Sequence, residues 1–327
     1  MERRHFIKTG SVALLAAGMT RLNTERMSTI KHDAIIIGGS FSGLSAALAL
    51  ARARMQVLVI DTNEPCNARV PHAHNLLTQD GEPPQAIRAK ARADVVRYAT
   101  VRWHESRAIQ ASGSNGAFVV RTADGMAHHG RKLLLALGVR DAMLDIPGFA
   151  ACWGISAAAC PFCHGYEVAD AALGILGNSP EVVDYARLIR QWSRRITVLT
   201  NGPAMFTEEQ RALLAPLSIA LEEAPVARVE HADGRITSVV LHDDRRIALT
   251  ALFARPTTSV PVAFAEGLGC AVTAAGLLQV DPMQRTTVPG VFASGDCAMP
   301  MRSLSMAIAS GTVAGAAIVH ELVLADP

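Results

Sequence analysis

The chain has 327 residues, half of them hydrophobic, which is long enough for about two domains with a large packed core. The 31 Lys and Arg residues nearly balance the 29 Asp and Glu residues, and the resulting net charge of +2 argues against a nucleic-acid partner. Six cysteines are too few for a disulfide scaffold, and no run reaches the roughly 18 consecutive apolar residues that span a bilayer. We therefore expect no nucleic-acid partner and no integral membrane segment.

The N-terminus resembles a twin-arginine export signal. Arg3 and Arg4 are followed by an aromatic and an aliphatic residue and then by the apolar, small-residue run 11–18. The pattern predicts that residues 1–30 are signal and linker and that the protein is exported to the periplasm or the extracellular side. A start of translation at Met27 would instead give a cytoplasmic protein.

The next segment predicts a βαβ unit. Two apolar runs, 34–37 and 57–60, flank a glycine turn and the alanine-rich segment 44–54. Asp61 ends the second run 23 positions after Gly38, close to the spacing of roughly 20 at which an acidic residue binds an adenosine ribose. This spacing predicts a dinucleotide site, although Ser40 replaces the second glycine of the usual turn.

A second strand-turn-helix-strand pattern begins at Gly174 and predicts a second Rossmann-like unit, with a helix that runs through Trp192. Its turn is degraded, because Ser179 stands where a second small residue is expected and Pro180 lacks a backbone N–H that could face a pyrophosphate. The residues 200–202 after its second strand contain no arginine for a 2′-phosphate. Binding of NAD(P)H is therefore doubtful.

Three further segments complete the pattern. The buried strand 132–138 ends in glycine, and the Pro-Gly pair at 147–148 indicates a crossover between domains. Near the C-terminus, the apolar strand 286–296 closes on Gly-Asp and precedes a helix, 303–324, rich in small residues. We expect this helix to pack closely on neighbouring backbone.

The most reactive feature is Cys160-Pro-Phe-Cys163-His164. A C-x-x-C turn at the start of a helix brings two sulfur atoms within disulfide reach, and the helix N-terminus and a nearby imidazole favour the thiolate. His164 could move a proton to or from a thiol, because histidine titrates near neutral pH. These residues predict thiol-disulfide exchange.

Three other interpretations of the motif remain open. Cys-x-x-Cys-His is the attachment pattern of c-type haem, zinc could bind if other ligands joined the cluster, and two structural thiols could simply share a helix. No second cysteine pair stands at finger-like spacing, so we expect no metal. The remaining cysteines are expected to be packed small hydrophobes at Cys66, Cys152 and Cys270, with Cys297 near a cofactor.

The order of these features resembles the low-molecular-weight thioredoxin reductases, a family of FAD-dependent disulfide oxidoreductases. From Lys31 to the C-terminus that order is glycine turn, glycine-ended strand, C-x-x-C, second dinucleotide unit and V-F-A-x-G-D. The chain most resembles the gliotoxin- and holomycin-type dithiol oxidases and their bacterial relatives, which share Gly-Gly-Ser at the first turn and the C-x-x-C-H-G-Y-E block. Thioredoxin reductases proper have Asp where this chain has His164.

The resemblance implies an α/β fold of two Rossmann-like dinucleotide-binding domains of the three-layer ββα type. The FAD-binding domain would be split between 31–149 and 256–327. An inserted NAD(P)-binding-like domain at 150–255 would carry the redox cysteines. Family members are usually homodimers, so we expect a homodimer here.

The resemblance also implies roles for individual residues. Cys163 would be the thiol nearest the flavin, Cys160 the thiol that exchanges with substrate, and His164 the acid/base. Asp61 would bind the adenosine ribose, and the helix N-terminus near Met306 would face the flavin. The implied FAD contacts are Gly38, Gly39, Ser40, Gly43, Asp61, Asn67, Gly295, Asp296 and Met306.

The FAD-binding motifs are intact, whereas the second turn, which would bind a nicotinamide electron donor, is degraded. This contrast predicts a dithiol oxidase. Electrons would pass from a dithiol through Cys160 and Cys163 to FAD and then to O₂ or another acceptor. The substrate would be a small-molecule dithiol or disulfide, or a thioredoxin-like protein. The alternatives are an NAD(P)H-dependent thioredoxin-type reductase and a flavin-binding redox sensor without turnover.

The loop 71–85 is ambiguous. It includes His72 and His74, which could contribute side chains to a substrate pocket. Histidines in a polar loop are more often surface residues, so we expect both to lie outside the site.

Overall fold

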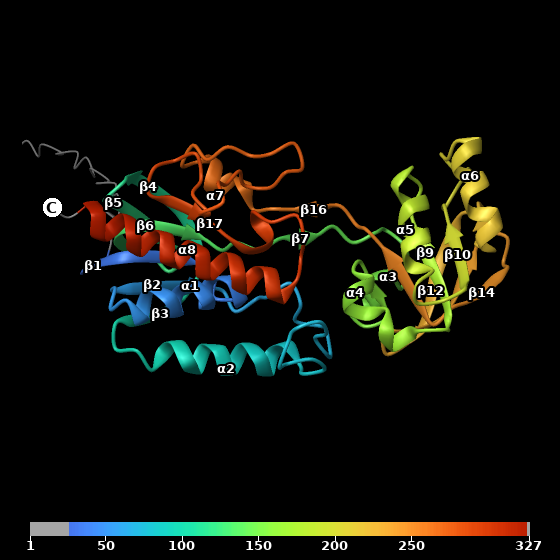
Figure 1. The fold of residues 1–327 in the computed structure, drawn as a ribbon, viewed down its shortest axis with the longest axis horizontal. Coiled ribbons are helices and arrows are strands. Elements are labelled where there is room, and N and C mark those ends of the chain that lie inside the picture. Colours follow the sequence, from blue (N-terminus) through green and yellow to red (C-terminus); the bar gives the residue numbers. More distant parts are fainter. Residues whose placement is uncertain (1–25, 326–327) are drawn as a thin grey trace, which may run out of the picture.

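The computed structural model describes residues 26–325, and the predicted export signal lies outside this described part. The elements form two units, each built around a parallel sheet (Figure 1). The first unit contains β1–β6 and β17, and the second contains β8–β15. Two chain segments run between the units, and β7 and β16 within them pair antiparallel. The predicted two-domain α/β fold is confirmed.

The elements of the first unit and of the connecting segments are β1 (Arg26–Ile37), α1 (Phe41–Arg52), β2 (Val57–Asp61), α2 (Pro84–Val96), β3 (Val101–Glu105), β4 (Ala108–Ser114), β5 (Ala117–Thr122), β6 (Met126–Leu135), β7 (Arg140–Asp141), β16 (Thr258–Ser259), α7 (Val262–Glu266), β17 (Val291–Ala293) and α8 (Leu304–Ala325). Those of the second unit are α3 (Phe149–Cys152), β8 (Ala157–Ala158), α4 (Pro161–His164), β9 (Ala172–Leu176), α5 (Glu181–Ile189), β10 (Arg195–Leu199), α6 (Glu208–Leu214), β11 (Ala220–Glu222), β12 (Val226–Ala232), β13 (Arg235–Leu241), β14 (Arg246–Ala248) and β15 (Ala251–Ala254). Single 3-10 turns are η1 (Tyr166–Val168), η2 (Ala215–Leu217) and η3 (Gly295–Cys297).

The first unit has three layers because the side chains of its parallel strands alternate between two apolar faces. Ala34 and Ile36 of β1 pack with helices α1 and α8 on one face. Ile35 and Ile37 pack on the other face with residues of the antiparallel strands β4 and β5. Since both faces are covered here, the end of the strand at 34–37 is continuously apolar, as the sequence pattern indicated.

Strand β6 joins the N-terminal and C-terminal parts of this unit. One edge of β6 pairs parallel with β1 along its length. On the other edge the first half pairs antiparallel with β5 and the second half pairs parallel with β17. Leu133, for example, pairs with both Ile35 and Val291. The C-terminal segment therefore completes a sheet begun about 250 residues earlier, which brings its Gly-Asp turn to the carboxyl edge of the strands.

Helices α1 and α8 pack with their backbones close together, as the small residues of α8 predicted. A Cβ added at Gly311 would lie 2.1 Å from the carbonyl oxygen of Ser42, so only glycine fits there. The stretch Leu304–Leu324 is long and apolar enough to cross a membrane by length and composition, a test that buried core helices also pass. Here Ala314 and Ile318 pack in the core shared with α1.

The second unit is also doubly covered. Its sheet has the order β11-β10-β9-β15-β8, with parallel pairing throughout, and a separate antiparallel ribbon is formed by β12, β13 and β14. The helix α5 ends at Ile189 rather than at the predicted Trp192. The backbone N–H of Trp192 instead closes a turn to Ile189, and its carbonyl accepts a hydrogen bond from Asp170.

Candidate functional site

A cavity of about 1100 Å³ is lined by both units. The first unit contributes the start of α1, the loop that follows β2, the Gly-Asp turn after β17 and the start of α8. The second unit contributes the C-x-x-C segment together with Leu188 and Arg255. The predicted redox cysteines and most of the predicted dinucleotide contacts thus face one space.

The glycine turn before α1 has the shape of a phosphate-binding site. Gly38 has a φ of +108°, and a Cβ added there would lie 2.1 Å from the carbonyl oxygen of Ala136. A Cβ at Gly43 would lie 1.9 Å from the carbonyl oxygen of Gly38. Ser40 precedes the helix, its side chain makes no capping hydrogen bond, and the first turn carries no acidic residue. The free N–H groups at this end of α1 can therefore receive a pyrophosphate.

Asp61 is fixed at the end of β2 by its neighbours. Its Oδ1 accepts a 2.9 Å hydrogen bond from the backbone N–H of Gly39, and its Oδ2 lies 3.4 Å from the guanidinium of Arg88. The carboxylate lines the cavity, as expected of a ribose ligand. Gly39 does not line it. A Cβ there would meet the ring of Trp103 at 2.3 Å, so this glycine permits packing behind the turn.

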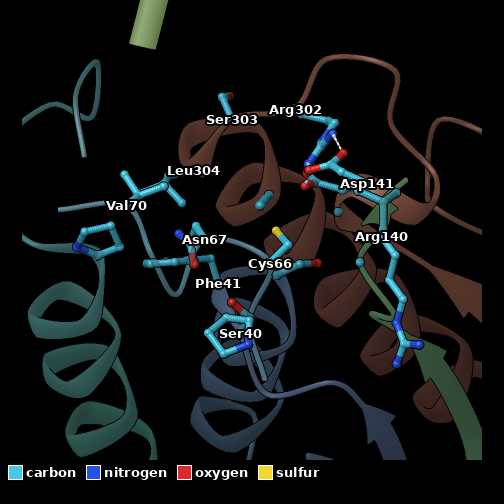
Figure 2. Close-up of a pocket in the computed structure, with 18 of the residues that line it drawn as sticks. Ser40, Phe41, Cys66, Asn67, Val70, Arg140, Asp141, Arg302, Ser303 and Leu304 are labelled. Carbon is cyan, nitrogen blue, oxygen red and sulfur yellow. Dashed lines mark hydrogen bonds and ion pairs between the residues drawn. The ribbon is translucent and has the colours of Figure 1, made fainter. Parts of the chain in front are cut away.

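The Gly-Asp turn at the C-terminal side places Asp296 beside two residues absent from the prediction. The Nε of Arg302 lies 3.5 Å from Oδ2 of Asp296, and its Nη1 donates a 2.6 Å hydrogen bond to Asp141 (Figure 2). Burial raises the pKa of Asp296, while Arg302 opposes that shift. Asn67 and Gly295 also line the cavity. Arg302 and Asp141 stand far apart in the sequence, which gave no signal that they would meet.

The N-terminus of α8 forms part of the same wall, but not through Met306. The backbone N–H of Met306 donates to the side chain of Ser303, which caps the helix, and Met306 does not line the cavity. The residues that do line it are Ser303, Leu304 and Ala307. The predicted helix end is therefore present at the cavity. Its contacts come from Ser303, Leu304 and Ala307 and not from the expected Met306.

The cysteine pair is held on a single helical turn. Cys160 and Cys163 form a disulfide, with their Cα atoms 5.3 Å apart. The ring of Phe162 packs edge-on against Trp192 at 5.3 Å, and a Cβ at Gly165 would come within 2.8 Å of the same indole. The pair stands at the start of a helix, as predicted, but α4 has only four residues, so its dipole gives a thiolate little support.

His164 follows directly on the pair and also lines the cavity. Burial lowers its pKa, Glu167 raises it and His74 lowers it, and the net effect is a decrease from the ordinary value. The imidazole is therefore neutral at pH 7 and can accept a proton from a thiol. The sequence predicted an acid/base at this position, and burial makes it start as the base.

Of the four free cysteines, one was assigned wrongly. Cys152, Cys270 and Cys297 are buried, and burial raises the pKa of Cys297 to about 11. Cys66, expected to be a packed residue, instead lines the cavity beside Asn67 (Figure 2). Burial and then the charge of Asp296 raise its pKa, so its sulfur is present as the thiol.

The loop after β2 contributes the two histidines that we expected to lie outside the site. His72 and His74 both line the cavity, and His74 contacts Glu167 of the second unit. This location depends on how the two units meet, and a local sequence pattern carries no information about that.

The second Rossmann turn differs from the first in shape and charge. Val182, in place of a small residue, would meet a Cβ at Gly177 at 2.8 Å. The side chain of Asn178 donates a 2.8 Å hydrogen bond to the carbonyl of Pro203 and accepts a 2.7 Å one from the N–H of Met205. These two hydrogen bonds hold the loop after β10 against the second Rossmann turn.

Charge at this second turn also opposes a phosphate. The first turn of α5 carries two carboxylates, Glu181 and Asp184, where the first unit has none. Strand β11 ends at Glu222, and Glu222 and the following Glu223 pair with Arg245 and Arg211. A pyrophosphate at this helix end would face negative charge, so the predicted weakness of the site has a physical basis.

Among the described residues, no group of three or more His, Cys, Asp or Glu side chains is arranged to hold a metal ion. The features of the cavity are a phosphate-binding turn, a ribose-binding carboxylate, a helix N-terminus and an adjacent cysteine pair. They define a dinucleotide-dependent disulfide oxidoreductase. The first-unit residues present fit FAD.

The chain belongs to the pyridine nucleotide-disulphide oxidoreductase family, whose model matches residues 32–311. Thioredoxin reductase sirT of Leptosphaeria maculans is 32% identical over 311 residues, which cover 90% of this chain and 95% of that protein. An oxidoreductase structure from Agrobacterium tumefaciens is 39% identical, has a TM-score of 0.85 and covers 91% of this chain and 100% of its own. The structure of HlmI is 35% identical, with a TM-score of 0.86 and coverage of 92% and 95%.

These comparisons confirm the predicted resemblance to thioredoxin reductases. The protein is an FAD-dependent oxidoreductase with redox-active disulfide chemistry. When bound, FAD would supply a two-electron acceptor. Its binding would rest on the turn before α1, on Asp61 and Asp296, and on the N-terminus of α8.

Proposed function

We propose that this enzyme oxidises a dithiol to a disulfide and passes the electrons through Cys160 and Cys163 to FAD and then to O₂ or another acceptor. The observation that carries the proposal is the contrast between the two Rossmann turns. The first Rossmann turn leads into a helix, α1, whose first turn has no acidic side chain. The second is held by the hydrogen bonds of Asn178 and leads into a helix, α5, that has carboxylates in its first turn. A bound FAD is thus supported and a nicotinamide electron donor is not.

The chain's own groups account for the exchange. Neutral His164 takes the proton of one substrate thiol, and the resulting thiolate attacks Sγ of Cys160, which breaks the bond to Cys163. The second substrate thiol then attacks the substrate sulfur of the mixed disulfide, which expels the Cys160 sulfur, and its proton passes to that departing sulfur. The substrate leaves as a disulfide, and Cys160 and Cys163 hold its two electrons. Their disulfide reforms when those electrons pass to FAD.

Consumption of O₂ tests this proposal directly. The purified flavoprotein is mixed with dithiothreitol in air-saturated buffer without NAD(P)H. We expect O₂ uptake in proportion to the dithiol that is oxidised. Because another acceptor could replace O₂, the same assay is repeated with a quinone or a dye, and absence of dithiol oxidation with every acceptor would refute the proposal.

A second candidate is an NAD(P)H-dependent reductase of the thioredoxin type. It is favoured by the names of the relatives, which include thioredoxin reductases, and by the second unit itself, which keeps a parallel β9-α5-β10 arrangement. Steady NADPH consumption with a thioredoxin-like disulfide would establish it. The substrate is accordingly a small dithiol or disulfide, or a thioredoxin-like protein.

We further propose that residues 31–149 and 256–327 form the FAD domain, that 150–255 form the inserted domain, and that the enzyme is an exported homodimer. The split sheet of the first unit supports the domain boundaries. The usual behaviour of the family supports the homodimer. Light scattering after size-exclusion chromatography tests the dimer. Cell fractionation of the wild type against a double Arg3→Lys, Arg4→Lys variant tests export, and equal distribution of both would contradict it.

A further inference from the structure

His74 lies between two carboxylates that come from different units. Its Nε2 is 3.4 Å from Oε1 of Glu167, which stands three residues after His164 in the second unit. Its Nδ1 is 3.7 Å from Oδ2 of Asp80 in its own loop. The ring of His74 therefore lies within ion-pair distance of one carboxylate from each unit.

The loop that presents His74 is internally fixed. The other oxygen of Asp80 accepts a 2.7 Å hydrogen bond from the backbone N–H of Asn75. The backbone of Ala73 makes two more hydrogen bonds across the loop, to Glu82 and from Gly81. The side chain of His74 is 20% exposed, against 67% for Asp80. Asp80, His74 and Glu167 therefore form a row of polar side chains that extends from the exposed Asp80 to the cavity, which His74 lines together with the cysteine pair.

From this geometry we propose that His74 is a positioning residue for the active site. It holds Glu167 across the boundary between the units and thereby determines when His164 can take a proton from a thiol. This inference rests on the proposed function, since it assigns His164 as the base. It also couples proton transfer to the arrangement of the two units, because His74 reaches Glu167 only when they are in contact.

The electrostatic effects on His164 have opposite signs. Burial lowers the pKa of His164, Glu167 raises it and His74 lowers it, and these are the described groups that act on it. Replacing Glu167 by Gln should lower that pKa further. Replacing His74 by Gln removes the group that lowers the pKa of His164 and takes away a partner of Glu167, so the pKa of His164 should rise. A residue with a purely structural role would not give opposite shifts for the two partners.

The test is an NMR titration of His164 in the oxidised, flavin-loaded protein, with histidine labelled at the ring carbon. The signal is assigned by its loss in His164→Gln. We expect the midpoint to move up in His74→Gln and down in Glu167→Gln. His320→Gln, a matched change at an exposed position on α8, should leave it unmoved. Asp80→Asn, on an exposed carboxylate, should move it in the same direction as His74→Gln and serves if that variant fails to fold.

Unmoved midpoints, or shifts of the same sign in His74→Gln and Glu167→Gln, would overturn the inference. The pH profile of dithiol oxidation provides a second readout, and its acid limb should move in the same directions. Because the titration needs no substrate, the two proposals fail separately. Opposite shifts without dithiol oxidation would refute only the proposed function, and dithiol oxidation without shifts would refute only the role of His74.

Discussion

The hydroxyl groups of Ser42 and Ser294 lie 2.5 Å apart in the buried centre of the first unit, although 252 positions separate them in the chain. Ser42 belongs to the first turn of α1 and Ser294 follows β17. The next residue, Gly295, lines the cavity and donates its N–H to Ser310 of α8. The FAD site is therefore complete only when the C-terminal segment has returned to the N-terminal helix.

A side chain at the first turn should displace the cofactor. In Gly43→Ala the new Cβ would lie 1.9 Å from the carbonyl oxygen of Gly38, so the turn must move. We expect the purified variant to lose most of its flavin absorbance relative to protein. In the control Gly267→Ala, at a φ of −59°, the nearest atoms lie 3.4 and 3.5 Å away, and flavin should be retained. Full flavin content in Gly43→Ala would contradict this account of the turn.

Loss of the exchange thiol should stop turnover without loss of flavin. In Cys160→Ser no disulfide can form with Cys163, so the dithiol has no electrophilic sulfur to attack. Dithiol oxidation should fall to background while the flavin spectrum remains. Cys270→Ser, at a buried thiol that does not line the cavity, is the control. Repeated turnover by the wild type also excludes a role as a sensor alone.

The rate of dithiol oxidation should be the same at mildly acidic pH as at neutral pH. Burial lowers the pKa of His164 below its ordinary value near 6.5, so the ring stays unprotonated as pH falls through that value. The acid limb of the dithiol-oxidation profile should therefore lie below pH 6.5. His164→Gln should reduce the rate by about 10²–10⁴-fold, the usual contribution of a general base. An acid limb above pH 6.5 in the wild type would contradict the assignment.

A second histidine group should make the fold sensitive to acid. His128 is buried beside His104, their ring centres are 4.7 Å apart, and burial followed by the nearby histidines lowers the pKa of His128 to about 4. Its folded pKa is below its unfolded value of 6.5, so the stabilisation is present above pH 6.5 and is lost as pH falls towards 4. The free energy of unfolding should fall by roughly 3 kcal/mol over this range.

Urea unfolding at neutral pH and at about pH 5 measures this effect. The wild type should lose stability between the two, and His128→Leu, which cannot be protonated, should lose less. His320→Gln, at an exposed position, should behave as the wild type does. Equal pH dependence of His128→Leu and the wild type would show that other groups cause the acid sensitivity.

Local patterns predicted the elements and the reactive motif because both depend on neighbouring residues. The glycine turn, the acidic end of β2 and the C-x-x-C pair each lie within a short segment, and the cavity contains all three. The small residues of α8 predicted its close packing, which Gly311 shows.

The missed residues depend on contacts between distant segments. Arg302 meets Asp141 from a position 161 residues away, and His74 reaches Glu167 only through the contact between units. The shift from Met306 to its neighbours is of a different kind, since it depends on which residue caps α8, and Ser303 does. The residues that make such contacts can be identified only from the tertiary structure.

The most direct test of the account is an anaerobic visible spectrum of the flavoprotein, recorded during addition of dithiothreitol and, in a separate sample, of NADPH. We predict that the dithiol bleaches the flavin, that air restores its colour, and that NADPH has no effect within the same time. The Cys160→Ser protein should not be bleached by the dithiol. Rapid bleaching by NADPH would show that the second Rossmann turn works despite its tied loop and acidic helix end, and would make the enzyme a reductase.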